Sequence, residues 1–118
     1  MNTTFFGISV DCADAAALAR FWGNVLGREV AAGASAGNAI LLVDDDPASG
    51  PPITFHQVPE GKIVKNRLHL DLITHAFDTE SKRLLSLGAR RLNDVEANGS
   101  RWTTFADVEG NEFDLIAG

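Results

Sequence analysis

The chain has 118 residues, 45% of them hydrophobic and 22% charged, which is the composition of a globular domain rather than of a disordered segment. A formal net charge of -6 argues against nucleic acid or an anionic membrane surface as partner. Its single cysteine, Cys12, excludes an internal disulfide and a thiolate zinc cage, and no apolar stretch approaches the roughly 18 to 20 residues that span a bilayer. We therefore expect one cytoplasmic domain covering residues 1–118.

The first half of the chain reads as a strand, a helix and three further strands. Asp14 is a plausible helix N-cap, and the apolar residues that follow it recur at helical spacing up to Gly27, which suits a left-handed C-terminal cap. Alternation of apolar and polar residues, together with Pro- and Gly-rich turns, predicts strands at residues 4–10, 28–32, 38–43 and 53–58.

The second half repeats this order. A strand at residues 68–72 leads to a helix that Asp78 is expected to cap and that ends at Leu87-Gly88. Asn98-Gly99 is a strong signal for a two-residue hairpin. The remaining strands are expected at residues 89–93, 102–105 and 112–115.

Short motifs also repeat between the two halves. The motif Leu26-Gly27, followed by Arg28, recurs about half the chain later as Leu87-Gly88, followed by Arg90. We interpret this as a duplicated βαββ unit of the α+β class, the first unit covering about 1–60 and the second about 61–118. Because each copy has one helix, each half-sheet has one bare face, and we expect the two bare faces to enclose a cavity.

Two strands of the second unit carry polar groups opposite their apolar residues. His69 and Asp71 alternate with Leu68, Leu70 and Leu72. Near the C-terminus, Glu112 and Asp114 alternate with Phe113 and Leu115 in the same way. The pattern predicts a polar-lined cup backed by helices.

Three stretches resemble a known family: the helix ending in Phe-Trp-x-x-Val-Leu-Gly (21–27), the segment Val58 to Asp71, and the closing turn Asp107 to Phe113. Together they resemble the vicinal oxygen chelate superfamily, which includes glyoxalase I, bleomycin-resistance proteins and extradiol dioxygenases. Within it the chain is most similar to small glyoxalase-like proteins. The resemblance implies the tandem βαββ fold around a central cavity, and a homodimer.

The resemblance also implies a metal-ligand pattern. In metal-using members each unit supplies one ligand from its first strand, usually His, and one from its last strand, usually Glu. His69 and Asp114 fall on these positions in the second unit, with Asp in place of Glu. In the first unit the His position falls on Gly7, and the remaining position falls near His56, with Thr54 on the same face.

Several readings of these residues stay open at this point. His56, His69 and Asp114 are candidates for a two-His-one-carboxylate site for Fe(II), Mn(II), Ni(II) or Zn(II). Alternatively no metal binds, and His69 is hydrogen-bonded to Asp71 or Asp114, or acts there as an acid or base. Candidate ligand-binding residues are Asp71, Phe55, Trp102 and Arg67, although Trp102 equally suits the core and Arg67 a surface salt bridge.

Two functions follow from the resemblance. The first is metal-assisted lyase, isomerase or dioxygenase chemistry on a small molecule with two adjacent oxygens. The second is a metal-free binding module, bleomycin-resistance-like, that sequesters an antibiotic or metabolite between subunits.

Overall fold

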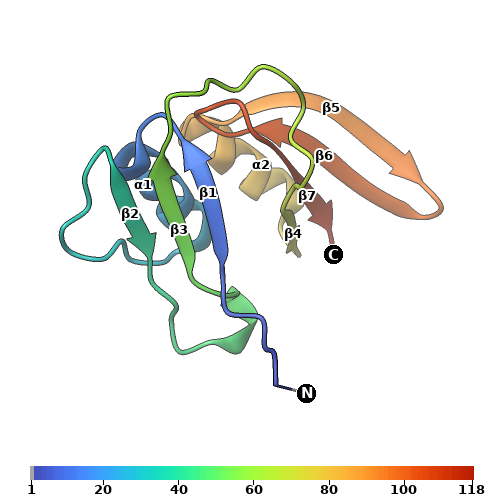
Figure 1. Ribbon diagram of the computed structural model, residues 1–118. Helices are drawn as coiled ribbons and strands as arrows, with labels where there is room; N and C mark the ends of the chain where they lie inside the picture. The colour runs from blue at the N-terminus through green and yellow to red at the C-terminus, as the bar shows by residue number, and fades with distance from the viewer. Residues whose placement is uncertain (1) are drawn as a thin grey trace. The chain divides into compact units, whose positions relative to one another are not determined.

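The computed structural model describes residues 2–118 (Figure 1). The chain forms two compact units, one ending at Gly61 and the other spanning Lys62–Gly118, and each is described by itself. Within residues 2–118, no helix combines the length and the apolar character that crossing a membrane requires.

The first unit is a three-stranded sheet with one α-helix. Its elements, in chain order, are β1 (Ile8–Cys12), α1 (Ala15–Leu26), β2 (Asn38–Leu41), the short 3₁₀ helix η1 (Pro47–Ser49) and β3 (Ile53–Gln57). The strand order is β1-β3-β2, with β1 parallel and β2 antiparallel to the central β3.

Helix α1 begins and ends where its sequence predicts. The Asp14 carboxylate accepts a hydrogen bond from the backbone N–H of Ala17, and Gly27 adopts φ 66° at the C-terminal cap. The apolar stripe of the helix packs on the sheet, where Phe55 is fully buried. This packing covers one face of the first sheet and leaves Thr54 and His56 on the other face of β3.

The second unit is a four-stranded sheet with one α-helix. Its elements are β4 (Asp71–Thr74), α2 (Phe77–Ser86), β5 (Arg90–Ala97), β6 (Ser100–Ala106) and β7 (Glu112–Ala117). The strand order is β4-β7-β6-β5, with β4 parallel to β7 and the other pairs antiparallel. Figure 1 shows β5 and β6 as a long hairpin, whose tip is Asn98-Gly99 with φ 53° and 80°, so the predicted hairpin is confirmed.

The core of the second unit lies between its sheet and α2. Leu84 of α2 is buried, as are Phe105 and Phe113, whose rings stack with centroids 5.7 Å apart. Alternation therefore turns Asp114 of β7 and Thr104 of β6 to the face opposite α2.

The two units have matching topology, which confirms the duplicated α+β pattern. In each, the first strand pairs in parallel with the last strand of the unit, and the last strand also pairs with an antiparallel neighbour. The strand that follows the helix differs between the two units. The strand expected at residues 28–32 is reduced to a single bridge between Val30 and Leu41, whereas β5 is eight residues long.

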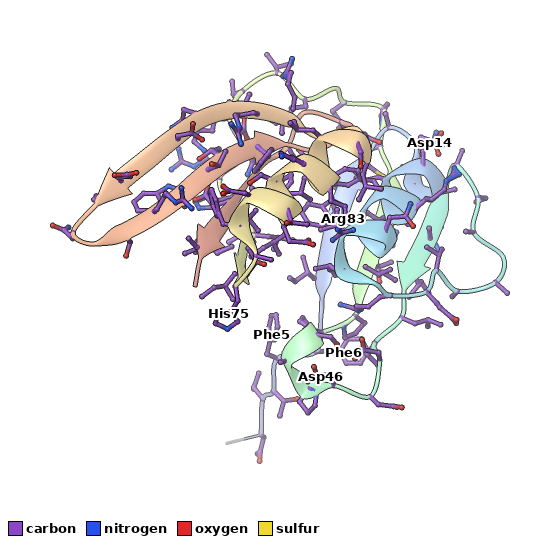
Figure 2. The ribbon with its side chains drawn as sticks, turned by 180° about the vertical axis from the view of Figure 1, so that it is seen from behind. Phe5, Phe6, Asp14, Asp46, His75 and Arg83 are labelled. Carbon is purple, nitrogen blue, oxygen red and sulfur yellow. The ribbon has the colours of Figure 1, made fainter. Side chains whose placement is uncertain are left out.

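Among the predicted boundaries that differ from the structure, three concern the first strand of a unit or the start of a helix. The first strand begins at Ile8 rather than at residue 4, because pairing with β3 begins only there; Phe5 and Phe6, labelled in Figure 2, precede it and are 75% and 84% exposed. The strand expected from Leu68 begins at Asp71. Helix α2 begins one residue before Asp78, at Phe77, so Asp78 lies in the first turn and does not cap the helix.

Candidate functional site

Three neighbouring strands of the second sheet place polar side chains in one row. Asp71 of β4 is paired in register with Asp114 of β7, and Asp114 is paired with Thr104 of β6. All three side chains lie on the sheet face opposite α2. The parallel pairing of the first strand with the last therefore brings together carboxylates that are 43 positions apart in sequence.

His69 lies two residues before β4, and its imidazole points at both carboxylates. The Nε2 atom is 3.3 Å from Oδ1 of Asp71 and 3.3 Å from Oδ2 of Asp114. The side chains of His69 and Asp71 are 42% and 57% exposed, while that of Asp114 is 17% exposed. Asp114 is thus the sheltered carboxylate of the pair, and Asp71 the solvent-facing one.

The Asp114 carboxylate is held from its other side by Thr104. The Thr104 hydroxyl donates a hydrogen bond of 2.6 Å to Oδ1 of Asp114. Because Oδ1 is engaged by Thr104, Oδ2 is the oxygen presented to His69. This contact fixes the orientation of the carboxylate plane.

Glu112, two residues before Asp114, forms a second polar group at the start of β7. Its Oε1 is 3.4 Å from the Lys62 ammonium, and its Oε2 accepts a hydrogen bond of 3.2 Å from the backbone N–H of Asn66. Burial opposes ionisation of Glu112, but the backbone hydrogen bonds and the Lys62 charge outweigh it and hold the pKa of Glu112 below its usual value.

The cluster of His69, Asp71 and Asp114 has the donor chemistry of a divalent-cation site. Each residue offers one ligand atom, and the three atoms lie within 4.8 Å of one another. One imidazole nitrogen and two carboxylate oxygens suit Mn(II), Fe(II) or Zn(II), since carboxylates favour harder cations and imidazole favours the later metals. The residues present therefore fit the kind of metal that the sequence resemblance implies, with Asp71 in the ligand set.

The predicted site residues are only partly brought together. His69 lies beside both Asp71 and Asp114, where the sequence leaves a pairing with one or the other as an open alternative. His56 lies in the first unit, on the face of β3 opposite α1, and its role as a metal ligand stays a prediction. Asp71, expected to bind substrate, is a candidate ligand of the cluster.

Gly7, which falls on the first unit's histidine position, has no room for a side chain. A Cβ atom built there would lie 2.8 Å from the backbone carbonyl oxygen of Pro52. Real Cβ atoms essentially never approach so closely, and a backbone atom cannot swing aside as a side chain can. The first unit therefore cannot present a ligand from this position without moving its backbone.

The expectation for Phe55 is wrong, whereas those for Trp102 and Arg67 stay predictions. Phe55 is 0% exposed on the face of β3 that α1 covers, so it belongs to the core and does not line a site on the opposite face. Trp102 is half-buried and, two residues from Thr104 on β6, shares its face of the sheet. Arg67 is exposed in the segment that precedes β4.

Sequence reasoning missed the contacts of two residues: Thr104, whose hydroxyl donates to Asp114, and Asn66, whose backbone N–H donates to Glu112. Thr104 contacts Asp114 only because β6 and β7 pair in one register, and the sequence does not state that register. Asn66 lies in the segment that carries the family resemblance, which was the available signal for it.

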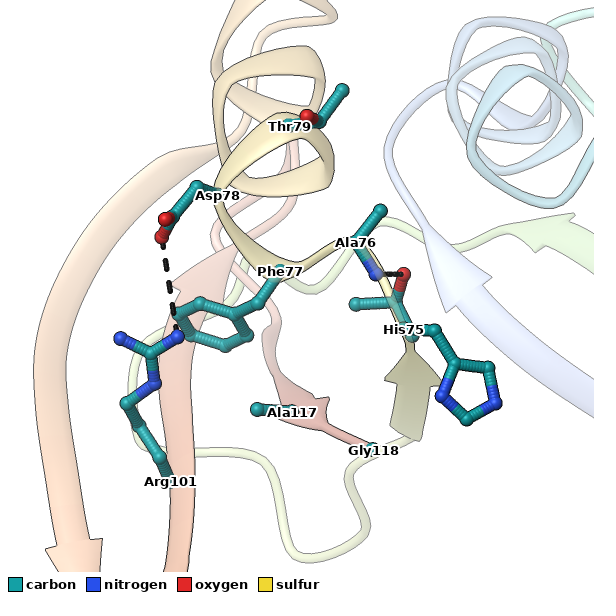
Figure 3. Close-up of a pocket in the computed structure, with 9 residues that line it drawn as sticks. His75, Ala76, Phe77, Asp78, Thr79, Arg101, Ala117 and Gly118 are labelled. Atoms are coloured by element: carbon teal, nitrogen blue, oxygen red, sulfur yellow. Dashed lines mark hydrogen bonds and ion pairs between the residues drawn. The ribbon is translucent and has the colours of Figure 1, made fainter.

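A hollow of about 400 Å³ lies elsewhere in the second unit, at the start of α2 (Figure 3). The Arg101 guanidinium lies over the Phe77 ring, 4.2 Å from its centroid, and 4.0 Å from the Asp78 carboxylate. Its cation is thus already engaged by an aromatic ring and a carboxylate. The lining residues do not include His69 or its partners, so this hollow is separate from the His69 cluster.

Solved structures with the same fold include several related proteins. A variant of the fosfomycin resistance protein FosX from Listeria monocytogenes, complexed with Mn(II) and 1S,2S-dihydroxypropylphosphonic acid, matches with a TM-score of 0.77 at 18% identity, covering 100% of this chain and 92% of that one. A glyoxalase/bleomycin resistance protein/dioxygenase family enzyme from Burkholderia phytofirmans PsJN matches with a TM-score of 0.74 at 16% identity, covering 94% and 95%. A glyoxalase-related enzyme from Fulvimarina pelagi matches with a TM-score of 0.71 at 16% identity, covering 98% and 88%.

At these identities the solved structures establish the fold alone. A comparison with curated protein sequences gave no match. The model of the glyoxalase-like domain, however, matches residues 7–116, which is nearly the whole chain and includes every residue of the His69 cluster. The chain therefore belongs to the glyoxalase-like domain family, within the vicinal oxygen chelate superfamily.

Proposed function

We propose that this protein is a metal-dependent enzyme acting on a small molecule with two adjacent oxygens, and that His69, Asp71 and Asp114 hold the metal. The observation that carries the proposal is the convergence of both carboxylates on one imidazole nitrogen at 3.3 Å. Two aspartates next to each other repel unless a cation or a proton lies between them. A divalent cation satisfies this arrangement with the donor types it prefers.

A bound divalent metal would act as a Lewis acid that polarises a substrate oxygen. The chain's own residues orient and shelter the site. Thr104 fixes the inner carboxylate of Asp114, and the greater exposure of Asp71 places that carboxylate where substrate and solvent arrive. Trp102, on the same sheet face as Thr104, is the apolar surface we assign to contact with the body of the substrate.

The metal and the ligand bound in the FosX structure support this proposal. That protein was crystallised with Mn(II) and a dihydroxypropylphosphonic acid, a molecule with two adjacent hydroxyl groups. We infer the same general ligand class, a metal with a vicinal diol or its equivalent, for this chain. Lyase, isomerase and dioxygenase chemistry are all compatible with such a site.

The second candidate is a metal-free binding module, and the same contacts favour it. A proton on Nε2 of His69 can be shared between Asp71 and Asp114, which satisfies both carboxylates without a metal. In that case the cluster is a hydrogen-bonding or acid–base site in a ligand-binding cup. A homodimer that completes the cup is part of either proposal.

Metal titration separates the two candidates. The protein is purified without an affinity tag or chelator and titrated with Mn(II), Fe(II), Ni(II) and Zn(II), alongside His69→Ala and the control His75→Ala. His75 is a matched control because it is an exposed histidine of the same unit outside the cluster. About one metal per chain, lost in His69→Ala and kept in His75→Ala, supports the enzyme; no binding of any of these metals leaves the binding module.

A further inference from the structure

The segment that leads to His69 is attached to β7 by a side chain that takes the place of a strand. Among the described residues, 62–70 form neither helix nor strand. The Asn66 side-chain oxygen nevertheless accepts a 2.8 Å hydrogen bond from the backbone N–H of Glu112, and its amide nitrogen donates to the carbonyl of Glu112 at 3.3 Å. One side-chain amide thus pairs with both backbone groups of Glu112, as a neighbouring strand would.

The Glu112 side chain makes further contacts with the same segment. The backbone N–H of Asn66 donates to the Glu112 carboxylate at 3.2 Å, and the Lys62 ammonium lies 3.4 Å from the same carboxylate. The Asn66 amide also donates a 2.6 Å hydrogen bond to the carbonyl of Leu68, within the same segment. We call Lys62, Asn66 and Glu112 the clasp.

The chemistry of the clasp requires asparagine. An acceptor and a donor must lie at the end of one short side chain, because Oδ1 and Nδ2 serve opposite backbone groups of one residue. Aspartate keeps the acceptor but loses the donor, and places a second carboxylate beside that of Glu112. Alanine removes both.

The clasp also lies where it can set the geometry of the cluster. Asn66 precedes His69 by three residues, and Glu112 precedes Asp114 by two. The next tie between the two segments is the hydrogen bond of 3.0 Å from the backbone N–H of Asp114 to the carbonyl of Leu70. His69 therefore lies on a short irregular stretch that is fixed on both sides, at Asn66 and at Leu70.

From this arrangement we propose that Asn66 is a positioning residue, which holds the His69 imidazole against Asp114 by fixing residues 66–70 to the start of β7. The proposal deepens the proposed function and rests on it for its role in metal binding. Second-sphere contacts of this kind tune metal affinity by about 10- to 100-fold. Because Asn66 acts through the backbone, we expect an effect at the lower end, about tenfold.

The test compares Asn66→Ala and Asn66→Asp with Leu84→Ala, all at a temperature where circular dichroism shows each variant folded. Leu84 is buried in α2 and has no part in the clasp, so its variant reports general destabilisation. The first readout is the Mn(II) dissociation constant, from electron paramagnetic resonance of free Mn(II). The second is the metal-free NMR signal of the His69 imidazole, assigned by its loss in His69→Ala.

We expect Asn66→Ala and Asn66→Asp to weaken Mn(II) binding by about tenfold and to shift the His69 imidazole resonances toward those of a histidine that has no carboxylate partner. Leu84→Ala should change neither readout. Mn(II) affinity within about twofold of wild type together with unchanged His69 resonances overturns the proposal. If wild type binds no Mn(II), the metal-dependent function fails, and the imidazole resonances alone decide whether Asn66 positions His69.

Discussion

Gly7 gives the sharpest quantitative prediction, because the family pattern expects a histidine at a position that has no room for a side chain. We expect Gly7→Ala to destabilise the protein and Gly7→His to destabilise it at least as much, without improving metal binding. The reason is the contact of 2.8 Å between a Cβ atom at this position and the carbonyl oxygen of Pro52.

The size of the effect follows from two distances. Ordinary van der Waals contact for a Cβ begins at 3.4 Å, so the backbone must move by about 0.6 Å. The same carbonyl oxygen accepts a 3.0 Å hydrogen bond from the backbone N–H of Ile8, and a displacement of this size along that bond breaks it. Losing the bond costs about 1 kcal/mol and overpacking about 1 to 3 kcal/mol, partly offset by the lower unfolded-state entropy of alanine. We expect a net loss of about 2 kcal/mol.

Urea denaturation of wild type, Gly7→Ala and Gly37→Ala measures this. Gly37 is a matched control in the same unit, because its added Cβ would meet only the Ser35 hydroxyl, at 3.7 Å, and its φ is not left-handed. Gly37→Ala should be neutral or slightly stabilising. A change in unfolding free energy for Gly7→Ala within about 0.5 kcal/mol of zero would refute the steric argument.

Three further changes test other parts of the structure. The buried Arg28 guanidinium donates hydrogen bonds to the backbone carbonyls of Leu41, Leu42, Ser49 and Pro51. Because a lysine ammonium cannot reach all four carbonyls, Arg28→Lys should lower the free energy of urea unfolding by about 2 kcal/mol. An unchanged urea midpoint would contradict this. Thr104→Val removes the donor to Asp114 and should weaken Mn(II) binding about tenfold in a calorimetric titration, whereas equal affinity would mean that Thr104 does not orient the carboxylate. The pKa of Glu112 is lowered in the folded state, so its contribution to stability is present above its unfolded-state pKa and is lost as the pH falls through its folded-state pKa. Glu112→Gln should therefore be less stable than wild type near neutral pH, and a stability difference that persists undiminished in strong acid would argue against this linkage.

Local patterns predicted the elements whose signals lie within a few residues. Helix α1 has a capping Asp14, an apolar stripe and a terminal Gly27, and the hairpin has its Asn98-Gly99 turn. The start of β1 was misplaced because Phe5 and Phe6 have the composition of a strand, while pairing with β3 begins only at Ile8. Propensity indicates what a segment can form, but pairing decides where the strand begins.

The alternation of side chains between the two faces of a strand predicted part of the site. Alternation put His69 and Asp71 on one face, and Asp114 opposite the apolar residues of its own strand. It also put Phe55 on the face opposite Thr54, so the predicted ligand contact of Phe55 already conflicted with its position in the strand. The contacts of Thr104 and Asn66 arise from strand register and from an irregular segment, for which a single sequence carries no periodic signal.

The central claim is that one histidine and two carboxylates of the second unit form the metal site. Electron spin-echo envelope modulation of the Mn(II)-loaded protein counts the directly coordinated imidazole nitrogens, in wild type, His69→Ala and His56→Ala. We predict coupling to a single imidazole, absent in His69→Ala and unchanged in His56→Ala. Coupling to two imidazoles, with one lost in each variant, would contradict this ligand set and would favour the site of His56, His69 and Asp114 instead.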